Sequence, residues 1–148
     1  MQKYEPIRIL LADDDEDDRF LIQEAFSENK LENQLNFVTD GEELMDYLYQ
    51  RDKFSDKQAS PRPDLILLDL NMPRKDGREA LKEIKNDDDL KRIPVVILTT
   101  SEAEEDILKT YNMGVNSFIT KPVTFDGMVD IIKTLDKYWF QIVKLPVE

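Results

Sequence analysis

The sequence predicts an α/β fold built on a parallel β-sheet. Short apolar runs alternate with segments of helical periodicity, and this alternation occurs five times along the chain. Two of the runs, 65–68 and 95–98, are almost continuously apolar, which is typical of strands covered on both faces. Parallel neighbours cannot be joined by tight turns, so we expect each pair of strands to be connected through a helix by a right-handed crossover.

The expected strands are the five apolar runs, at 7–12, 35–39, 65–68, 95–98 and 117–119. The last of these is short and weaker. The segments between and after them repeat apolar residues at helical spacing, at 20–26, 44–49, 80–84, 107–111 and 125–135. Gly114 is placed to end the fourth helix and Thr124 precedes the fifth. A polar loop, 51–62, and an apolar C-terminal stretch, 138–145, lie outside this pattern.

The composition excludes several classes of chemistry. With neither histidine nor cysteine, the chain has no imidazole base, no thiol nucleophile and no Cys/His zinc site. Its four scattered glycines form no phosphate-binding glycine loop. A net charge of −12 argues against nucleic-acid binding and favours basic partners. The 148 residues contain no apolar stretch long enough for a membrane span, so we expect one soluble, cytoplasmic domain without a membrane partner.

Polar residues cluster where the apolar strands end. The first strand leads into 13–15 (three aspartates), the third into Asp69, the fourth into Thr99 and the fifth into Lys121. The carboxyl ends of parallel strands open on one edge of the sheet, where ligands bind. Crowded carboxylates without histidine or cysteine favour a hard cation, Mg²⁺ first. An ammonium and a hydroxyl nearby complete a site for a phosphoryl group, which one carboxylate can accept as nucleophile.

These motifs together resemble the receiver domains of two-component response regulators. The resemblance is carried by 9–15, 67–77, 93–100 and 118–122, in order, and extends over about 7–136. It implies a flavodoxin-like (CheY-like) fold, a doubly wound five-stranded parallel sheet with strand order 2-1-3-4-5. We therefore expect 1–148 to form a single receiver domain, with a core at 7–136 and a C-terminal apolar extension at 137–148.

The resemblance assigns roles to the residues at the strand ends. Asp69 looks like the phosphoacceptor. Asp13 and Asp14 look like the acidic pair that holds Mg²⁺ together with Asp69, and the backbone carbonyl of Asn71 would be a further ligand. Lys121 looks like the ammonium that pairs with the phosphoryl group.

Other positions match the switch elements of the family. Thr99 looks like the switch hydroxyl and Phe118 occupies the switch-aromatic position, where tyrosine is common. Asn71 and Ser101 would flank the phosphoryl group and tune its hydrolysis. The resemblance also implies a cis peptide bond at 121–122.

The implied function is a phosphoacceptor switch rather than an enzyme acting on a separate substrate. A sensor histidine kinase would be the donor, and output would pass through protein contacts. The loop at 51–62 and the tail at 138–145 resemble those of the stand-alone regulators that partner bacterial and cyanobacterial phytochrome kinases. The apolar tail either packs on its own domain or forms an exposed contact for a kinase or for a homodimer through the C-terminal half.

Alternatives remain at the level of sequence. Aspartates 13–15 could simply begin a helix, and Asp15 suits that position. A Mg²⁺-dependent phosphohydrolase of the haloacid-dehalogenase type would share the ion, the nucleophile and the lysine. A degenerate receiver would bind partners without accepting phosphate. Thr100 stands where the family usually has alanine, and we interpret 87–89 as a solvated loop rather than a second metal site.

Overall fold

The computed structural model of the chain describes residues 6–142, with side chains described as far as residue 139. The elements follow one another in the order β1 (Ile9–Ala12), α1 (Glu16–Glu28), β2 (Leu35–Val38), α2 (Gly41–Leu48), η1 (Asp52–Phe54), β3 (Leu65–Leu68), α3 (Gly77–Asn86), η2 (Leu90–Arg92), β4 (Val95–Thr99), α4 (Glu104–Met113), β5 (Ser117–Thr120), α5 (Phe125–Leu135) and η3 (Asp136–Ile142). The first two η elements are short 3₁₀ helices, and the third is a π-helical continuation of α5.

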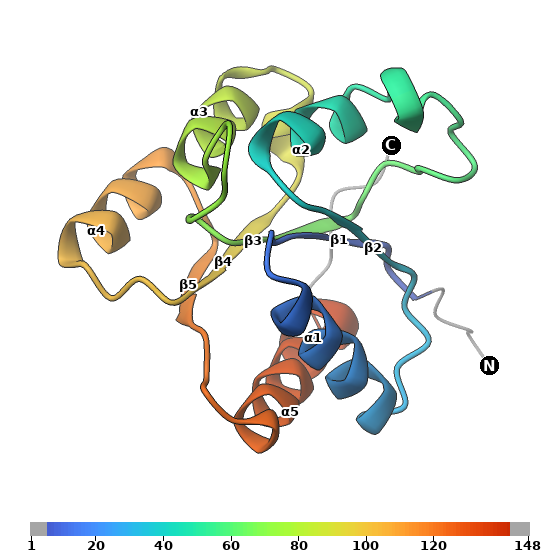
Figure 1. Ribbon diagram of the computed structural model, residues 1–148, viewed down its shortest axis with the longest axis vertical. Coiled ribbons are helices and arrows are strands. Elements are labelled where there is room, and N and C mark those ends of the chain that lie inside the picture. Colours follow the sequence, from blue (N-terminus) through green and yellow to red (C-terminus); the bar gives the residue numbers. More distant parts are fainter. Residues whose placement is uncertain (1–5, 143–148) are drawn as a thin grey trace.

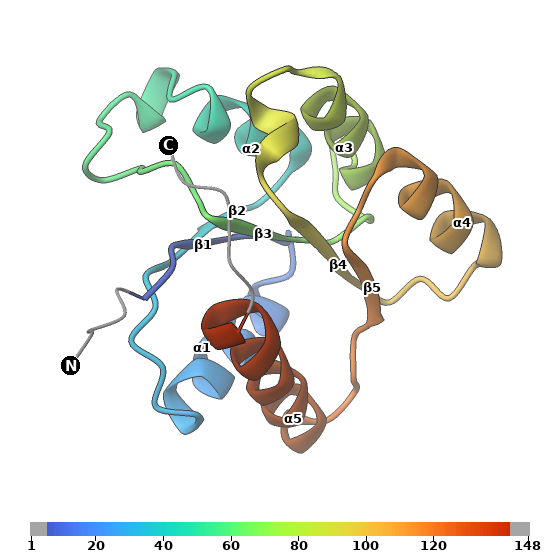
Figure 2. The ribbon, with the colours of Figure 1, turned by 180° about the vertical axis from the view of Figure 1, so that it is seen from behind.

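The five strands form one parallel sheet in the order β2-β1-β3-β4-β5. Helices α1 and α5 cover one face, and α2, α3 and α4 lie on the other (Figure 1). The reverse view shows α5 crossing the lower face beside α1 (Figure 2). The predicted doubly wound parallel sheet and its strand order are confirmed.

Side chains of the central strands fill both faces of the sheet. Leu10 and Ile66 pack towards α2 and α3, whereas Leu11 and Leu67 pack towards α1 and α5. Strands β1, β3 and β4 are buried along their whole length, while β2 and β5 at the edges are partly exposed. Burial on both faces explains why the central runs are continuously apolar instead of alternating.

Side chains at the strand-to-helix junctions fix where the helices begin. The N-caps that accept backbone N–H bonds are Asp15 of α1, Asp40 of α2, Asp76 of α3 and Thr124 of α5. Gly114 ends α4 with φ of 100°, as its position predicted. In the acidic loop at 87–89, the Asp87 carboxylate accepts hydrogen bonds from the amides of Asp89 and Leu90 and thereby caps the turn at η2.

Helix α4 does not bury the apolar residues that mark it in the sequence. Leu108 is 65% exposed and Tyr111 47%, whereas Asp106 and Thr110 are buried. A buried carboxylate is tolerated only with a partner, and Arg78 of α3 supplies one. The periodicity thus located the helix correctly, but Leu108 and Tyr111 lie away from the face that packs.

The start of the apolar tail packs on its own domain. Trp139 is 8% exposed and joins the cluster formed by Met128, Ile132 and Leu135 of α5. Tyr138 beside it is exposed. Residues 143–145 of the predicted tail lie outside the described residues. Within 6–142, none of the helices is both long and apolar enough to span a membrane.

Candidate functional site

Backbone pairing continues past the strands and brings their carboxyl ends together. The amide of Asp69 donates to the carbonyl of Ala12 (2.9 Å), which joins the ends of β3 and β1. The amide of Lys121 donates to the carbonyl of Thr99 (2.7 Å), which joins the ends of β5 and β4. Four segments far apart in the sequence therefore meet at one edge of the sheet.

Three of the predicted aspartates form a compact group at this edge. Asp13, Asp14 and Asp69 each offer a carboxylate oxygen, and these oxygens lie within 4.8 Å of one another. Asp13 and Asp69 are buried, while Asp14 is exposed to solvent. Asp15, the third residue of the acidic run, caps α1 instead. The group thus has two buried carboxylates and one open side.

Lys121 neutralises part of this charge. Its Nζ lies 2.7 Å from Asp13 Oδ2, 2.7 Å from Asp18 Oδ2 and 2.8 Å from Asp69 Oδ2. Burial lowers the pKa of the ammonium, but the three carboxylates outweigh burial and raise that pKa overall. The Lys121–Pro122 peptide is trans, like every peptide bond of the described residues, so the cis bond that the resemblance implied is wrong here. With this trans peptide bond, the Lys121 ammonium contacts all three carboxylates.

Sequence reasoning missed Asp18. It lies in the first turn of α1, and its carboxylate accepts a hydrogen bond from Lys121 Nζ. The signal was available, because a helix that begins directly after an acidic strand end turns its first residues back over that end.

Asp13 is held ionised at an electrostatic cost. Its side chain has no exposure, and burial raises its pKa to about 6, although the Lys121 ammonium and the Asp15 amide offset part of the effect. The Asp15 amide donates to Oδ1 (2.9 Å), and Oδ2 lies 2.7 Å from the Lys121 ammonium, which it shares with two other carboxylates. A fully buried carboxylate whose oxygen lies within 4.8 Å of oxygens of two further carboxylates fits a hard cation bound by oxygen ligands.

Thr99 and Asn71 hold the Asp69 carboxylate from the other side. Thr99 is fully buried, and its hydroxyl donates to Asp69 Oδ1 (2.7 Å). The amide of Asn71 donates to the same oxygen (3.1 Å). Asp69 is therefore held by a hydroxyl, an amide and an ammonium.

Phe118, the predicted switch aromatic, is partly buried against the core, and its amide donates to the Tyr111 hydroxyl (3.1 Å).

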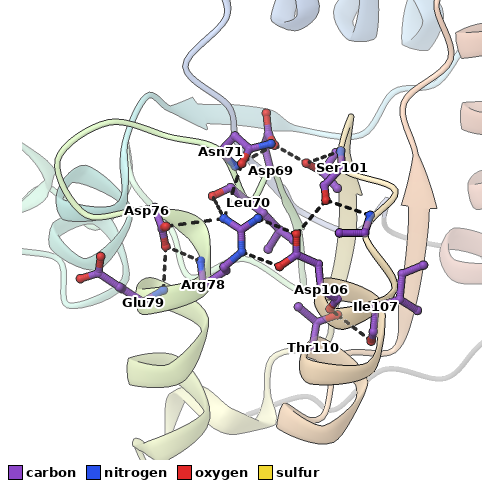
Figure 3. Close-up of polar contacts among 12 residues, drawn as sticks. Asp69, Leu70, Asn71, Asp76, Arg78, Glu79, Ser101, Asp106, Ile107 and Thr110 are labelled. Carbon is purple, nitrogen blue, oxygen red and sulfur yellow. Dashed lines mark hydrogen bonds and ion pairs between the residues drawn. The ribbon is translucent and has the colours of Figure 1, made fainter.

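A second polar cluster lies beside this site and was not predicted (Figure 3). Arg78 Nε and Nη2 each donate to one oxygen of Asp106 at 2.7 Å. The hydroxyl of Ser101 donates to Asp106 Oδ2 at 2.7 Å. The hydrogen bonds from Arg78 and then from Ser101 lower the pKa of Asp106 to about 2 despite its burial. Nothing in the sequence distinguished Asp106 from an ordinary acid in the first turn of a helix.

Comparison with known proteins agrees with the fold and the residue pattern. The family model of the response regulator receiver domain matches residues 9–133. Response regulator Rcp1 of Synechocystis sp. is 42% identical over 141 residues, which cover 95% of this chain and 94% of that protein. The chain therefore belongs to the response regulator receiver family, whose members accept phosphate from sensor histidine kinases.

Solved structures give the same result. The phosphorylated cyanobacterial phytochrome response regulator RcpA superposes with a TM-score of 0.89 at 43% identity, over 97% of this chain and all (100%) of that chain. The Mn²⁺-bound form of Rcp1 superposes with a TM-score of 0.86 at 42% identity, over 96% of this chain and 100% of that chain. The acidic group of this chain fits divalent metal binding in such a domain.

Proposed function

We propose that this protein is a phosphoacceptor switch in which Asp69 receives a phosphoryl group from the phosphohistidine of a sensor histidine kinase. One observation carries the proposal. The Asp69 carboxylate, 5% exposed, contacts the Thr99 hydroxyl and the Lys121 ammonium at the same time. A hydroxyl and an ammonium that converge on one carboxylate are the donors that a phosphoryl group on that carboxylate requires.

The transfer proceeds by in-line displacement. An oxygen of Asp69 attacks phosphorus, an oxygen–phosphorus bond forms, and the bond to the histidine nitrogen of the kinase breaks. Lys121 offsets negative charge on the transferring oxygens. The Thr99 hydroxyl, which donates to Asp69 in this structure, then donates to a phosphoryl oxygen. The protein assists its own phosphorylation and the later hydrolysis of its own phosphoryl group. It does not turn over a separate substrate.

Mg²⁺ is the proposed cofactor. Asp13, Asp14, Asp69 and the backbone carbonyl of Asn71 would hold it, and the three carboxylate oxygens that lie within 4.8 Å of one another support this assignment. When bound, the ion neutralises charge on phosphoryl oxygens. The Mn²⁺-bound form of the relative Rcp1 supports a divalent ion, and an all-oxygen ligand set favours Mg²⁺ in the cell.

Thr99 and Phe118 form the proposed switch. Movement of the Thr99 hydroxyl towards a phosphoryl oxygen changes the space next to β5, where Phe118 is partly buried. An inward and an outward position of this ring are two states of one packed surface, and phosphorylation biases the equilibrium between them.

Protein partners are proposed to read this surface. Leu108 and Tyr111 on α4 and Tyr138 after α5 are exposed, which supports contacts through the C-terminal half, including a homodimer. The similarity to the phytochrome response regulator RcpA supports a phytochrome-type kinase as donor. The net charge of −12 argues against nucleic acid as a partner, and we place the protein in the cytoplasm.

Acetyl phosphate provides a direct test. The purified protein is incubated with acetyl phosphate and Mg²⁺, and its intact mass is recorded beside that of Asp69→Asn. We expect one phosphoryl group on the wild type, none after EDTA treatment before the incubation, and none on the variant. Equal labelling of Asp69→Asn would overturn the assignment. Rapid turnover of an aryl phosphate would instead support a phosphohydrolase.

A further inference from the structure

The Arg78–Asp106–Ser101 cluster ties helix α3 to helix α4 beside the proposed phosphoacceptor. Arg78 donates one hydrogen bond to each oxygen of Asp106, both at 2.7 Å, and the Asp106 side chain is 12% exposed. Asp76 lies 3.5 Å from another nitrogen of the same guanidinium. A bidentate guanidinium–carboxylate pair is among the strongest and most directional contacts available to side chains. The cluster is thus a partly buried bidentate pair between two helices, and not a fully exposed surface ion pair.

The cluster determines where the Ser101 hydroxyl points. A serine hydroxyl has one proton, and Ser101 donates it to Asp106 Oδ2 at 2.7 Å. The hydroxyl oxygen accepts from the amide of Ala103 at 3.4 Å. In Figure 3 the hydroxyl of Ser101 is directed to Asp106, on the side of α4. While this bond persists, Ser101 has no proton to donate towards Asp69.

Ser101 is nevertheless close to the reacting group. Its amide lies 3.5 Å from Thr99 Oγ1, which itself donates to Asp69 Oδ1 at 2.7 Å. In the view of Figure 3, Asn71 and Ser101 lie on either side of Asp69. Arg78 contacts the surroundings of both residues. Its Nη1 is 3.5 Å from Asn71 Oδ1, and its Nη2 donates to Asp106 Oδ2, the oxygen that accepts from the Ser101 hydroxyl. One guanidinium therefore controls the two residues next to the acceptor.

We infer that Arg78 and Asp106 are positioning residues that hold the Ser101 hydroxyl away from the phosphoryl group and thereby lengthen the lifetime of the phosphorylated state. This inference rests on the proposed function of Asp69. Hydrolysis needs a water aligned with phosphorus, and a hydroxyl free to donate or accept at that position orients such a water. Occupying the Ser101 proton with Asp106 removes this help. Removing the Asp106 carboxylate from this position frees the Ser101 hydroxyl to donate to that water and speeds hydrolysis.

A double-mutant cycle separates this role from a general structural one. Wild type, Asp106→Ala, Ser101→Ala and the double variant are phosphorylated with acetyl phosphate and Mg²⁺. After removal of the donor, the loss of the phosphoryl group is followed by intact mass. We expect Asp106→Ala to shorten the lifetime several-fold when Ser101 is present and to have no effect when residue 101 is alanine. In the Ser101→Thr background, which keeps a hydroxyl, the effect of Asp106→Ala should return.

Two further variants control for charge and folding. Glu105→Ala removes the same charge from an exposed neighbour on α4 and should leave the lifetime unchanged. Arg78→Lys keeps the charge but no longer holds both oxygens of Asp106, so the Ser101 hydroxyl loses a fixed acceptor. The lifetime should shorten in the same Ser101-dependent manner, but less than in Asp106→Ala. If Asp106→Ala fails to fold, the Arg78→Lys cycle decides the question.

The outcomes distinguish this inference from the function on which it rests. A wild type that takes no phosphoryl group overturns both. A wild type that is phosphorylated, but whose lifetime changes equally with serine or alanine at position 101, overturns the inference alone. An unchanged or lengthened lifetime in Asp106→Ala overturns it as well.

Discussion

Replacing Asp13 by asparagine is expected to stabilise the metal-free protein. The Asp13 carboxylate has no exposure, and it shares one ammonium with Asp18 and Asp69. Burial raises its pKa from 3.8 to about 6, so folding at neutral pH holds it ionised against an unfavourable environment. The variant removes that charge and leaves the ion pairs of Lys121 with the other two carboxylates in place.

The size of the effect follows from the pKa. A pKa of about 6 for Asp13 in the folded protein, against 3.8 in the unfolded chain, corresponds to about 3 kcal/mol of destabilisation at pH 7. Asparagine has one acceptor oxygen, so it cannot accept from both the Asp15 amide and the Lys121 ammonium; the lost contact costs about 1 kcal/mol, and the net gain is about 2 kcal/mol. Because the folded pKa lies above the unfolded one, the cost of ionisation is full above pH 6 and disappears as the pH falls towards 4. The advantage of the variant should therefore shrink by about 1 kcal/mol between pH 7 and pH 5.

Urea unfolding in EDTA and in Mg²⁺ measures this directly. In EDTA at pH 7 the variant should unfold at higher urea than the wild type. Mg²⁺ at one hundred times its dissociation constant should stabilise the wild type by about 2.7 kcal/mol and the variant much less. A less stable variant in EDTA, or equal stabilisation of both proteins by Mg²⁺, would refute the electrostatic reasoning. Glu28→Gln, on the exposed end of α1, controls for loss of one acidic charge.

Three further substitutions test the packing around the site. Lys121→Met leaves two buried carboxylates without their cation and should destabilise the metal-free protein by about 3 kcal/mol, with part of the loss restored by Mg²⁺ in urea unfolding. Gly77→Ala places a methyl group 2.3 Å from the Asp69 carbonyl oxygen and should cost about 2 kcal/mol and weaken Mg²⁺ binding in a calorimetric titration. Trp139→Ala should cost about 3 kcal/mol in thermal unfolding, because the ring is 8% exposed against α5.

Each of these has an opposite result that would count against it. A Lys121→Met variant as stable as wild type in EDTA would show that the carboxylates relax into solvent and do not depend on the ammonium. Unchanged Mg²⁺ affinity in Gly77→Ala would show that the start of α3 does not fix Asp69. A Trp139→Ala variant of wild-type stability would mean that the tail contributes nothing to the domain and serves contacts elsewhere.

Much of the fold could be predicted because its signals are local. The continuous apolar runs at 65–68 and 95–98 identified buried parallel strands, and Gly114 marked the end of α4 through its left-handed backbone. The placing of the site at the carboxyl edge of the sheet followed from the topology alone. The meeting of Asp13, Asp14 and Asp69 at that edge is a consequence of this arrangement.

What escaped prediction depends on contacts between elements distant in sequence. Asp18 joins the site only because α1 begins directly over the end of β1 and meets Lys121 from β5. Asp106 is buried only because Arg78, which comes from another helix, neutralises it. A helix with polar residues on its packed face contradicts the usual periodicity, so α4 could not be oriented from its own sequence. The pairing of Asp106 with Arg78 is visible only in three dimensions.

The most direct test of the central claim is to locate the phosphoryl group on the chain. After incubation with acetyl phosphate and Mg²⁺, borohydride reduction converts an aspartyl phosphate to homoserine, and peptide mass spectrometry identifies the position. We predict homoserine at position 69 alone, and none when EDTA is present before the donor is added. Homoserine at position 13 or 14, with Asp69 unmodified, would contradict it.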